Sequence, residues 1–375
     1  MRELFSQQNI ILKKLFHSAI ENGVFPGAAV AIFKGVAEER RGGIFCYGES
    51  SYSDKNRRHV DEHTFYDLAS LTKPMATLPA LLSLMARGVV GVDDKLPDLL
   101  GEKIKSEKKR IRLRDILGHC SGLPSYLPFF AVIEKNEWKK KTVKEEIKKI
   151  ILNTPLSYAP KSRSLYSDPG FILAGMIVEK QSAMGLGEYL DKKLYSPLGI
   201  EKRIFFNKQS NPEPGFYARG EYCHLRERLL QAEVGDENCF IMGHEAGHAG
   251  LFGDITGVSS LLCRFFDLWR GEGVNPFPFG QKDISIFFDR RENHAQNSTW
   301  ALGVDTPSGE HSSAGGYISG KSVGHLGYSG TSFWLDPDNE LVIILLTNRV
   351  HPCRSNEKIR WFRPLFHETI YRGVA

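Results

Sequence analysis

The chain has 375 residues, of which 41% are apolar and 25% are charged. These fractions are close to the averages of globular proteins and exclude a disordered, collagen-like or coiled-coil chain. The 49 lysines and arginines exceed the 44 aspartates and glutamates by only five, so the charge does not indicate a nucleic-acid-binding protein. The length predicts two domains, or one large domain with an insertion.

The first residues predict an amphipathic helix and not a secretion signal. Apolar residues recur at helical spacing between Leu4 and Ile20, while Gln7 to Asn9 interrupt the apolar run that a signal peptide needs. The longest apolar stretch, residues 74–86, is too short to cross a bilayer. Six scattered cysteines without a CxxC pair indicate neither a zinc ribbon nor a disulfide framework. We therefore expect a cytoplasmic protein that does not associate with a membrane.

Both ends of the chain predict β-structure, and the middle predicts helices. Residues 26–35 and 42–50 are short β-rich runs closed by glycines, which predicts a hairpin. Residues 331–350 hold two apolar runs around Asp-Pro-Asp-Asn, which predicts a strand, a turn and a strand. A final helix is expected over about 357–371, and helical patterns dominate from 71 to about 269.

This order of elements predicts a mixed α/β fold of the α+β type. An antiparallel sheet flanked by helices is expected from residues 1–68 and 296–375. A mostly helical domain, residues 69–295, is expected as an insertion between them. Active sites often lie between domains, so we expect the site in the cleft between these two.

The segment TFYDLASLTKPMATLPALL, residues 64–82, is the most informative one. Proline is tolerated only in the first turn of a helix, where its missing N–H has no partner in any case. Pro74 therefore predicts that a helix begins near Leu71, and Pro79 predicts a kink in that helix. Ser70 then lies at the positive end of the helix, with Lys73 on the same side.

Ser70 and Lys73 have the spacing of a nucleophile and its base in acyl transfer. A lysine activates a serine when the amine is neutral. The helix end contributes only about 0.3–1 kcal/mol, whereas burial lowers the pKa of a lysine by up to about 3–5 units. We therefore expect burial to do most of the tuning, with the N–H of Ser70 donating to a developing oxyanion. The pattern alone is weak, because Ser-x-x-Lys also begins at Ser106 and Ser355, in charged stretches.

Three motifs in chain order resemble those of the penicillin-recognising serine hydrolases. They are Ser70-Leu-Thr-Lys73, Tyr166-Ser-Asp168 and His325-Leu-Gly327, at the places of Ser-x-x-Lys, Tyr-x-Asn and Lys-Thr-Gly or His-Thr-Gly. Flanking stretches such as 116–124 and 347–352 also look like this family, so the resemblance covers most of the chain. The branch that it resembles most contains the class C β-lactamases, family VIII-type esterases and D-specific peptidases.

The resemblance implies a role for each motif. Ser70 is expected to be the nucleophile, and Lys73 and Tyr166 are expected to share its proton and pass it to the leaving group. A phenol has an ordinary pKa near 10, so Lys73 must lower the pKa of Tyr166 for it to act as a base. His325 is expected on an edge strand beside the site, and the N–H of Tyr328, just after Gly327, is expected as the second oxyanion donor. No metal and no cofactor is implied.

Two departures from the family bear on the substrate. Asp168 stands where many members have Asn, and an ionised carboxylate accepts hydrogen bonds but cannot donate one to a substrate carbonyl. It is also expected to hold Lys73 in its charged form. Leu326 lacks a hydroxyl, and His325 lacks a fixed charge near pH 7. These departures favour hydrolysis of an ester, or of an uncommon amide or peptide, over efficient β-lactam turnover.

Other functions remain as alternatives. A catalytically silent relative would bind cell-wall or acyl ligands at the same place. His244-Glu245-x-x-His248 is the string of a zinc peptidase, although the glycines around it disfavour the helix that such a site needs. Residues 315–322 match a Walker A string, but their flanks are polar and glycine-rich where a P-loop has a strand and a helix.

The expected partner is a small ester, amide or peptide substrate. No nucleic acid and no membrane partner is expected, because the lysine-rich segments 103–110 and 138–149 also carry glutamates and predict solvated helix faces. The Phe/Pro-rich stretch from Tyr126 to Trp138 is a candidate lid over the acyl pocket. The sequence does not indicate an oligomeric state.

Overall fold

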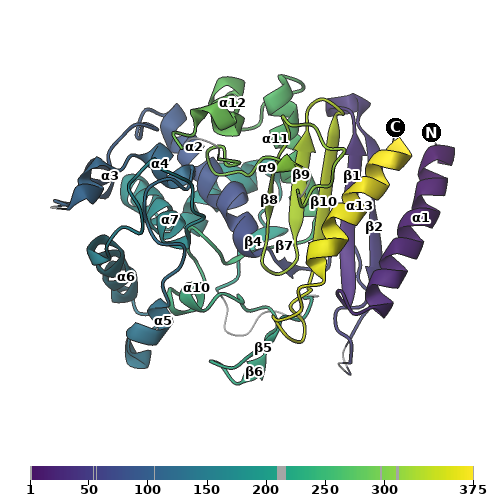
Figure 1. Cartoon of the computed structure of the whole chain (residues 1–375), viewed down its shortest axis with the longest axis horizontal. Helices are drawn as coiled ribbons and strands as arrows, with labels where there is room; N and C mark the ends of the chain where they lie inside the picture. Colours follow the sequence, from purple (N-terminus) through teal and green to yellow (C-terminus); the bar gives the residue numbers. More distant parts are fainter. Residues whose placement is uncertain are drawn as a thin grey trace.

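A five-stranded antiparallel sheet has the strand order β2-β1-β10-β9-β8 (Figure 1). The computed structural model describes residues 2–53, 55, 57–104, 106–208, 217–295, 298–309 and 312–374. The strands of this sheet are β1 (Gly27–Lys34), β2 (Arg41–Gly48), β8 (Val323–Leu326), β9 (Ser332–Asp336) and β10 (Leu341–Thr347). The predicted hairpin and the predicted strand–turn–strand unit are both confirmed. β1 pairs with β10, so the two ends of the chain build one sheet.

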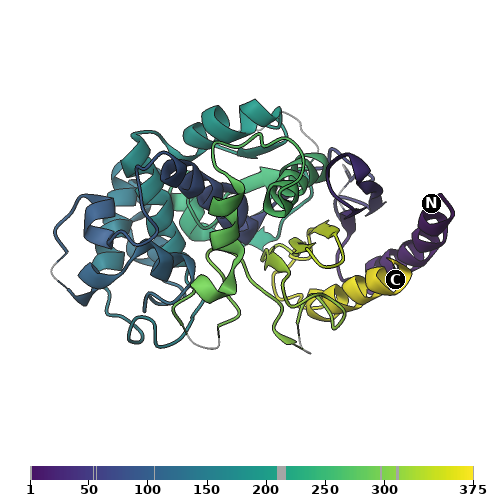
Figure 2. The same cartoon turned by 90° about the horizontal axis from the view of Figure 1, so that it is seen from above.

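Helices cover this sheet and fill the middle of the chain (Figure 2). The longer ones are α1 (Arg2–Glu21), α2 (Leu78–Ala86), α6 (Thr142–Asn153), α7 (Asp168–Ser182), α11 (Ile255–Arg270), α12 (Gln281–Phe288) and α13 (Ile359–Val374). The shorter ones are α3 (Leu96–Leu100), α4 (Leu113–Leu117), α5 (Phe129–Val132), α8 (Leu186–Leu190), α9 (Ser196–Leu198) and α10 (Glu237–Ile241). The predicted N-terminal and C-terminal helices are confirmed, and α1 packs against α13.

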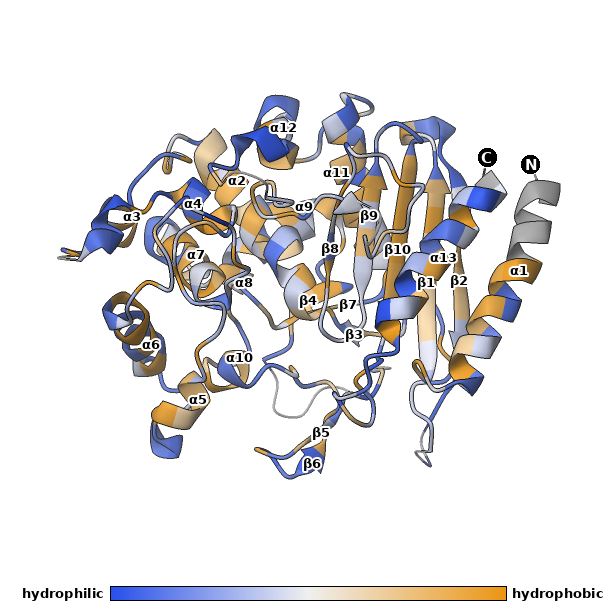
Figure 3. Ribbon diagram, in the orientation of Figure 1, coloured by the Kyte–Doolittle hydropathy of each residue, from blue (hydrophilic) through white to orange (hydrophobic). Residues whose placement is uncertain are grey.

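Alternate residues of the central strand β10 belong to two different cores, because successive side chains of a strand point to opposite faces. Ile343 and Leu345 pack in a core with residues of α1 and α13. Val342 and Ile344 belong to the main core on the other face, where α11 packs against β10 and β1. The sheet is therefore covered on both sides, and Figure 3 shows its central strands as mostly apolar. This arrangement confirms the predicted mixed α/β fold.

Two small sheets lie outside the large one. One has the order β3-β7-β4, with β3 (Tyr66–Asp67), β7 (Leu251–Gly253) and β4 (Ile204–Phe206). The other pairs β5 (Tyr222–Cys223) with β6 (Arg228–Leu229). The domain division at residues 68 and 296 stays a prediction. Within the described ranges, no helix is both long enough and apolar enough to cross a membrane.

The segment that was expected to form one kinked helix forms three pieces. A 3-10 helix η2 (Ala69–Leu71) leads into a π-helical turn η3 (Lys73–Thr77), and only then does α2 begin. Pro79 has no N–H to donate to the carbonyl of Met75, four residues earlier. The hydroxyl of Tyr195 donates to that carbonyl instead, at 2.9 Å. A distant tyrosine thus satisfies the group that the proline leaves free.

Candidate active site

Ser70 lies in η2, in a tight turn just after β3. Ala69 has a φ of +47°, in the left-handed region that side chains other than glycine rarely adopt. Asp67 holds this turn, because its carboxylate accepts the N–H of Ala69 at 2.8 Å and the N–H of Gly235 at 2.7 Å. Unusual backbone conformations of this kind cluster at functional sites.

Lys73 is fully buried beside Ser70. Its Nζ donates to Ser70 Oγ at 3.0 Å, to Asp168 Oδ1 at 2.8 Å and to the carbonyl of His248 at 3.1 Å. Burial lowers the pKa of Lys73, but Asp168 and then Tyr166 raise it more, so the pKa lies above its ordinary value. Burial alone therefore does not make this amine neutral, as direct activation of Ser70 by Lys73 requires, and the contact with Asp168 favours its charged form.

Tyr166 stands against the same lysine, whose Nζ lies 4.7 Å from the centre of the phenol ring. Burial raises the pKa of Tyr166, the positive charge of Lys73 lowers it by less, and the negative charge of Asp168 adds to the rise. The pKa of Tyr166 therefore lies above its ordinary value, whereas a phenol that acts alone as a base requires a lowered pKa. Lys73 and Tyr166 are so close that their ionisations belong to the pair and not to either residue alone.

His119 clamps Tyr166 in place, a feature that the sequence did not reveal. Its carbonyl accepts the N–H of Leu165 at 2.8 Å, and its Nδ1 accepts the N–H of Ser167 at 3.1 Å. The imidazole packs on Tyr166 with ring centres 4.6 Å apart. Burial lowers the pKa of His119 far below its ordinary value, so the ring is neutral. The sequence places His119 in the stretch 116–124, which resembles the family, but gives it no role.

Replacing His119 with phenylalanine tests this clamp. The ring contact is kept, but the N–H of Ser167 loses its acceptor, which typically costs about 1–3 kcal/mol of stability. We expect kcat to fall about tenfold with little change in KM, because small displacements of a catalytic group cost rate. Urea unfolding and ester kinetics measure both effects, and His17→Phe on the surface of α1 is the control. Unchanged kinetics in a destabilised His119→Phe protein would contradict a role in positioning Tyr166.

The third motif lies on the edge strand β8, as the resemblance implied. Burial, and then the charge of Lys73, lower the pKa of His325 to about 3, so its ring is neutral and supplies no charge. Gly327 cannot be replaced, since a Cβ there would lie 2.0 Å from Thr331 Oγ1 and 2.8 Å from the carbonyl oxygen of Leu68. The loop after β8 therefore approaches the turn before Ser70 very closely.

Hydrogen bonds tie that loop to the turn of Ser70. The hydroxyl of Ser329 donates to the carbonyl of Asp67 at 2.7 Å, and the hydroxyl of Thr331 donates to that of Leu68 at 3.2 Å. Among the described residues, neither the N–H of Ser70 nor the N–H of Tyr328 has a hydrogen-bond acceptor. Two free backbone donors held in a fixed relation are what an oxyanion hole requires.

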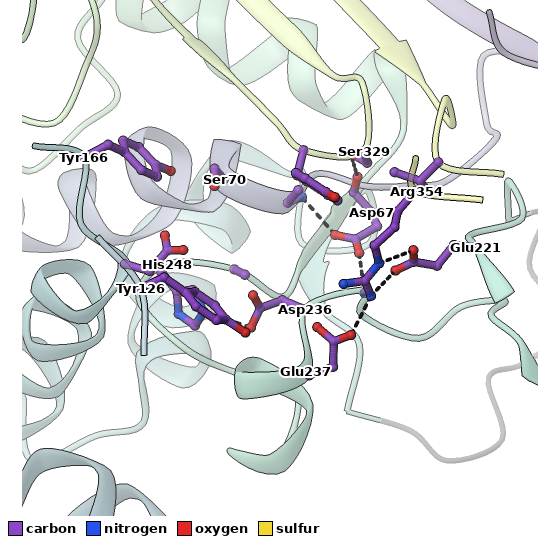
Figure 4. Close-up of a pocket in the computed structure, with 16 residues that line it drawn as sticks. Asp67, Ser70, Tyr126, Tyr166, Glu221, Asp236, Glu237, His248, Ser329 and Arg354 are labelled. Atoms are coloured by element: carbon purple, nitrogen blue, oxygen red, sulfur yellow. Dashed lines mark hydrogen bonds and ion pairs between the residues drawn. The ribbon is translucent and has the colours of Figure 1, made fainter. Parts of the chain in front are cut away.

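Two cavities of about 320 Å³ each meet at Ser70, Tyr166 and Tyr328, which line both of them. The first is shown in Figure 4 and is rich in carboxylates, namely Asp67, Asp168, Glu221, Asp236 and Glu237. The second is rich in arginines, namely Arg349, Arg360 and Arg363, and also contains Trp300, Asp305 and His325. Of the expected lid, Tyr126 lines the first cavity.

The carboxylates of the first cavity are partly neutralised. Arg354 donates to Glu221 at 2.5 and 2.6 Å and to Glu237 at 2.5 Å (Figure 4). Asp236 lies 2.9 Å from Nε2 of His248. Asp168 pairs with Lys73. Even after these pairs are counted, carboxylates outnumber cations around the cavity. Its walls therefore carry a negative potential on one side of Ser70.

The HExxH string does not form a zinc site. Residues 243–250 are not helical, so the two histidines do not share one face of a helix. His248 pairs with Asp236, Glu245 pairs with Lys208, and the ring of His244 packs on Phe240. No group of three His, Cys, Asp or Glu side chains in the described part of the chain is arranged to hold a metal ion. The Walker A string likewise leads into strand β8 and not into a helix.

The fold and this site define the class of protein as a serine hydrolase. Residues 12–366 match the family model described as Beta-lactamase. The chain therefore belongs to the β-lactamase family, which includes penicillin-binding-protein-like hydrolases, and the resemblance seen in the three motifs is confirmed.

Similar proteins carry several different activities in their names. A putative D-alanyl-D-alanine carboxypeptidase of Salmonella gallinarum is 33% identical over 321 residues, which cover 79% of this chain and 72% of that protein. The octameric penicillin-binding protein homologue of Pyrococcus abyssi has a TM-score of 0.72 at 19% identity and covers 98% of this chain and 77% of its own. EstCE1, a hydrolase with promiscuous acyltransferase activity, has a TM-score of 0.73 at 17% identity, with 98% and 99% covered. The two structures show the shared fold.

Proposed function

We propose that this chain hydrolyses an ester, or an amide or peptide of a D-amino acid, through an acyl-enzyme on Ser70. The observation that carries the proposal is the contact of Lys73 Nζ with Ser70 Oγ at 3.0 Å. Lys73 and Tyr166 act as one proton-sharing pair, which takes the proton of Ser70 and returns it to the leaving group. The N–H groups of Ser70 and Tyr328 stabilise the oxyanion. No metal or cofactor takes part in this proposal.

Loss of one proton from the pair leaves either a neutral amine or a phenolate, and either form accepts the proton of Ser70. Because the pKa values of Lys73 and Tyr166 both lie above their ordinary values, the basic form of the pair becomes populated only in alkaline solution. We therefore place the optimum of activity on the alkaline side of neutrality.

The first cavity favours a neutral or cationic group on the substrate. Its carboxylates repel an anionic group, while the arginines and the neutral His325 line the second cavity instead. The repulsion in the first cavity supports the preference for esters over β-lactams. Cleavage of D-alanyl peptides is the second candidate, because relatives at 33% identity are named as putative D-alanyl-D-alanine carboxypeptidases.

A substrate panel tests this proposal. Short p-nitrophenyl esters, nitrocefin and a peptide ending in D-Ala-D-Ala are compared, with Ser70→Ala as the control. We expect esters to be turned over at least tenfold faster than nitrocefin, and an ester with a trimethylammonium group to exceed its carboxylate-bearing counterpart. The charge effect is expected to shrink with added salt. Nitrocefin turnover equal to that of the esters would contradict the ester preference, and D-alanine release faster than both would establish the peptidase.

A further inference from the structure

Two buried arginines donate hydrogen bonds to the backbone carbonyls on either side of the N–H of Tyr328. Arg349 and Arg363 are each 7% exposed, and both line the second cavity together with Ser70. The neighbouring Arg354 and Arg360 have carboxylate partners, Glu221 and Glu357. Within the described residues, no carboxylate lies at ion-pair distance from either buried guanidinium, and Nε of Arg363 has no hydrogen-bond partner. A buried charge without a counter-charge is costly, so it calls for an explanation.

Arg363 is bound to the peptide unit that carries the N–H of Tyr328. Its Nη2 donates to the carbonyl of Gly327 at 2.9 Å and to the carbonyl of Thr331 at 2.8 Å. The carbonyl of Gly327 and the N–H of Tyr328 belong to one planar peptide group and point in opposite directions. A guanidinium on the carbonyl therefore fixes the direction of the N–H and, by drawing electron density from it, strengthens it as a donor.

Arg349 holds the other side of the same residue. Its Nε donates to the carbonyl of Tyr328 at 2.8 Å, and its guanidinium lies 4.4 Å from the centre of the Tyr328 ring. Burial, and then the charge of Arg349, lower the pKa of Arg363 to about 9, so Arg363 still carries its charge at neutral pH. Both carbonyls that flank the N–H of Tyr328 thus accept from charged donors.

We propose that Arg363 is a positioning residue that orients and polarises the N–H of Tyr328 toward the oxyanion. The inference rests on the proposed function. When Ser70 Oγ bonds to the substrate carbonyl carbon, the π electron pair of the carbonyl moves onto its oxygen. The negative charge formed there meets an unbalanced positive charge one peptide group away. When the carbonyl re-forms, the leaving group departs with its bonding electrons and takes the proton from the Lys73–Tyr166 pair. The charge of Arg363 thus favours the transition state over the bound substrate.

A direct contact between Arg363 and a substrate carboxylate is the competing explanation. Such a contact would act on ground-state binding and only for substrates that carry a carboxylate. A polarised donor acts on kcat for every substrate, including neutral esters. A neutral ester and its carboxylate-bearing counterpart therefore separate the two roles.

The experiment compares Arg363→Met, Arg363→Lys and Arg360→Met with the wild type. Arg360 is the comparison residue, because it lies on the same helix α13 and lines the same cavity, but among the described residues no hydrogen bond joins its side chain to Gly327. Each protein is first labelled with a fluorophosphonate, and the mass of the intact protein is measured by mass spectrometry. Ester kinetics, the affinity for a boronic acid that forms a tetrahedral adduct, and the carbonyl stretching frequency of a slow acyl-enzyme are then measured.

We expect Arg363→Met to lower kcat for the neutral ester about 10- to 100-fold with KM changed less than about threefold, since loss of a whole oxyanion donor costs about 10²–10³. Boronate affinity is expected to fall by the same factor, and the acyl carbonyl frequency to rise. Arg363→Lys should recover part of the loss. Arg360→Met removes a positive charge from the cavity wall without removing a hydrogen bond to Gly327, so its loss of kcat for the neutral ester should be much smaller than that of Arg363→Met.

The outcomes separate this inference from the proposed function. A wild type that takes no label overturns both. A labelled wild type with unchanged kcat in Arg363→Met overturns the inference alone, as does a rise in KM confined to the carboxylate-bearing ester. Equal losses in Arg363→Met and Arg360→Met also overturn it, because they would show only a general effect of charge. If Arg363→Met does not fold, Arg363→Lys decides: a carbonyl frequency equal to that of the wild type, with an unchanged kcat, contradicts the inference.

Discussion

Replacing Lys73 with methionine is expected to lower kcat/KM for a p-nitrophenyl ester by at least about 10³-fold. Nζ of Lys73 lies 3.0 Å from Ser70 Oγ and beside the ring of Tyr166, so the variant loses both the contact with the nucleophile and the cation that stabilises a phenolate. General acid–base groups contribute about 10²–10⁴-fold to rate. Steady-state kinetics with one ester, from which kcat and KM are separated, measures the effect.

The Lys73→Met variant also leaves Asp168 without its partner. An unpaired carboxylate that is mostly withdrawn from water destabilises a protein, so loss of folding could imitate loss of catalysis. The double variant Lys73→Met/Asp168→Asn removes that charge and is expected to fold yet remain inactive. Lys144→Met, which breaks the pair with Glu179 and does not line either cavity at Ser70, is the matched control and is expected to keep full activity. Activity within tenfold of the wild type in a folded Lys73→Met protein would contradict the proposed role.

Replacing Asp168 with asparagine is expected to shift the pH profile of kcat/KM toward acid. The carboxylate of Asp168 lies 2.8 Å from Lys73 Nζ and raises the pKa of that amine. An adjacent opposite charge typically shifts a pKa by about 1–3 units. Without it, the Lys73–Tyr166 pair loses its proton at lower pH, and the basic form is more abundant at pH 7. The acid limb should move down by about one unit or more, with up to about a tenfold gain at pH 7.

The sign of this shift is the test. An acid limb that stays in place would show that the pair does not limit the reaction. A limb that moves to higher pH, or a loss of activity at every pH, would show that the charged form of Lys73 is the one required. Asp305→Asn removes a carboxylate from the second cavity without touching Lys73, and it serves as the matched control.

The sheet was predictable because short local sequence patterns mark its strands and turns. The glycine-closed runs at 26–35 and 42–50 and the Asp-Pro-Asp-Asn turn each determine a strand end within a few residues. The three motifs also placed Ser70, Lys73 and Tyr166 together, as the structure does.

The features that the sequence did not predict depend on contacts between distant parts of the chain. In the π-helical turn after Ser70, the carbonyl of Met75 accepts a hydrogen bond from the hydroxyl of Tyr195, which lies more than 100 residues away in the sequence. The raised pKa of Lys73 depends on the balance between burial and the charge of Asp168, and a sequence gives no distances from which to weigh them. Arg363 lies in the predicted last helix, and nothing in the sequence around it indicates that it meets the carbonyl of Gly327.

The central claim is that Ser70 is the nucleophile, and intact-mass labelling with a fluorophosphonate tests it most directly. Wild type and Ser70→Ala are labelled side by side, and each is assayed with a short p-nitrophenyl ester. We predict one adduct per chain and ester turnover in the wild type, and the loss of both in Ser70→Ala. A wild type without an adduct, or equal labelling of the variant, would contradict the acyl-enzyme and favour a ligand-binding relative that performs no catalysis.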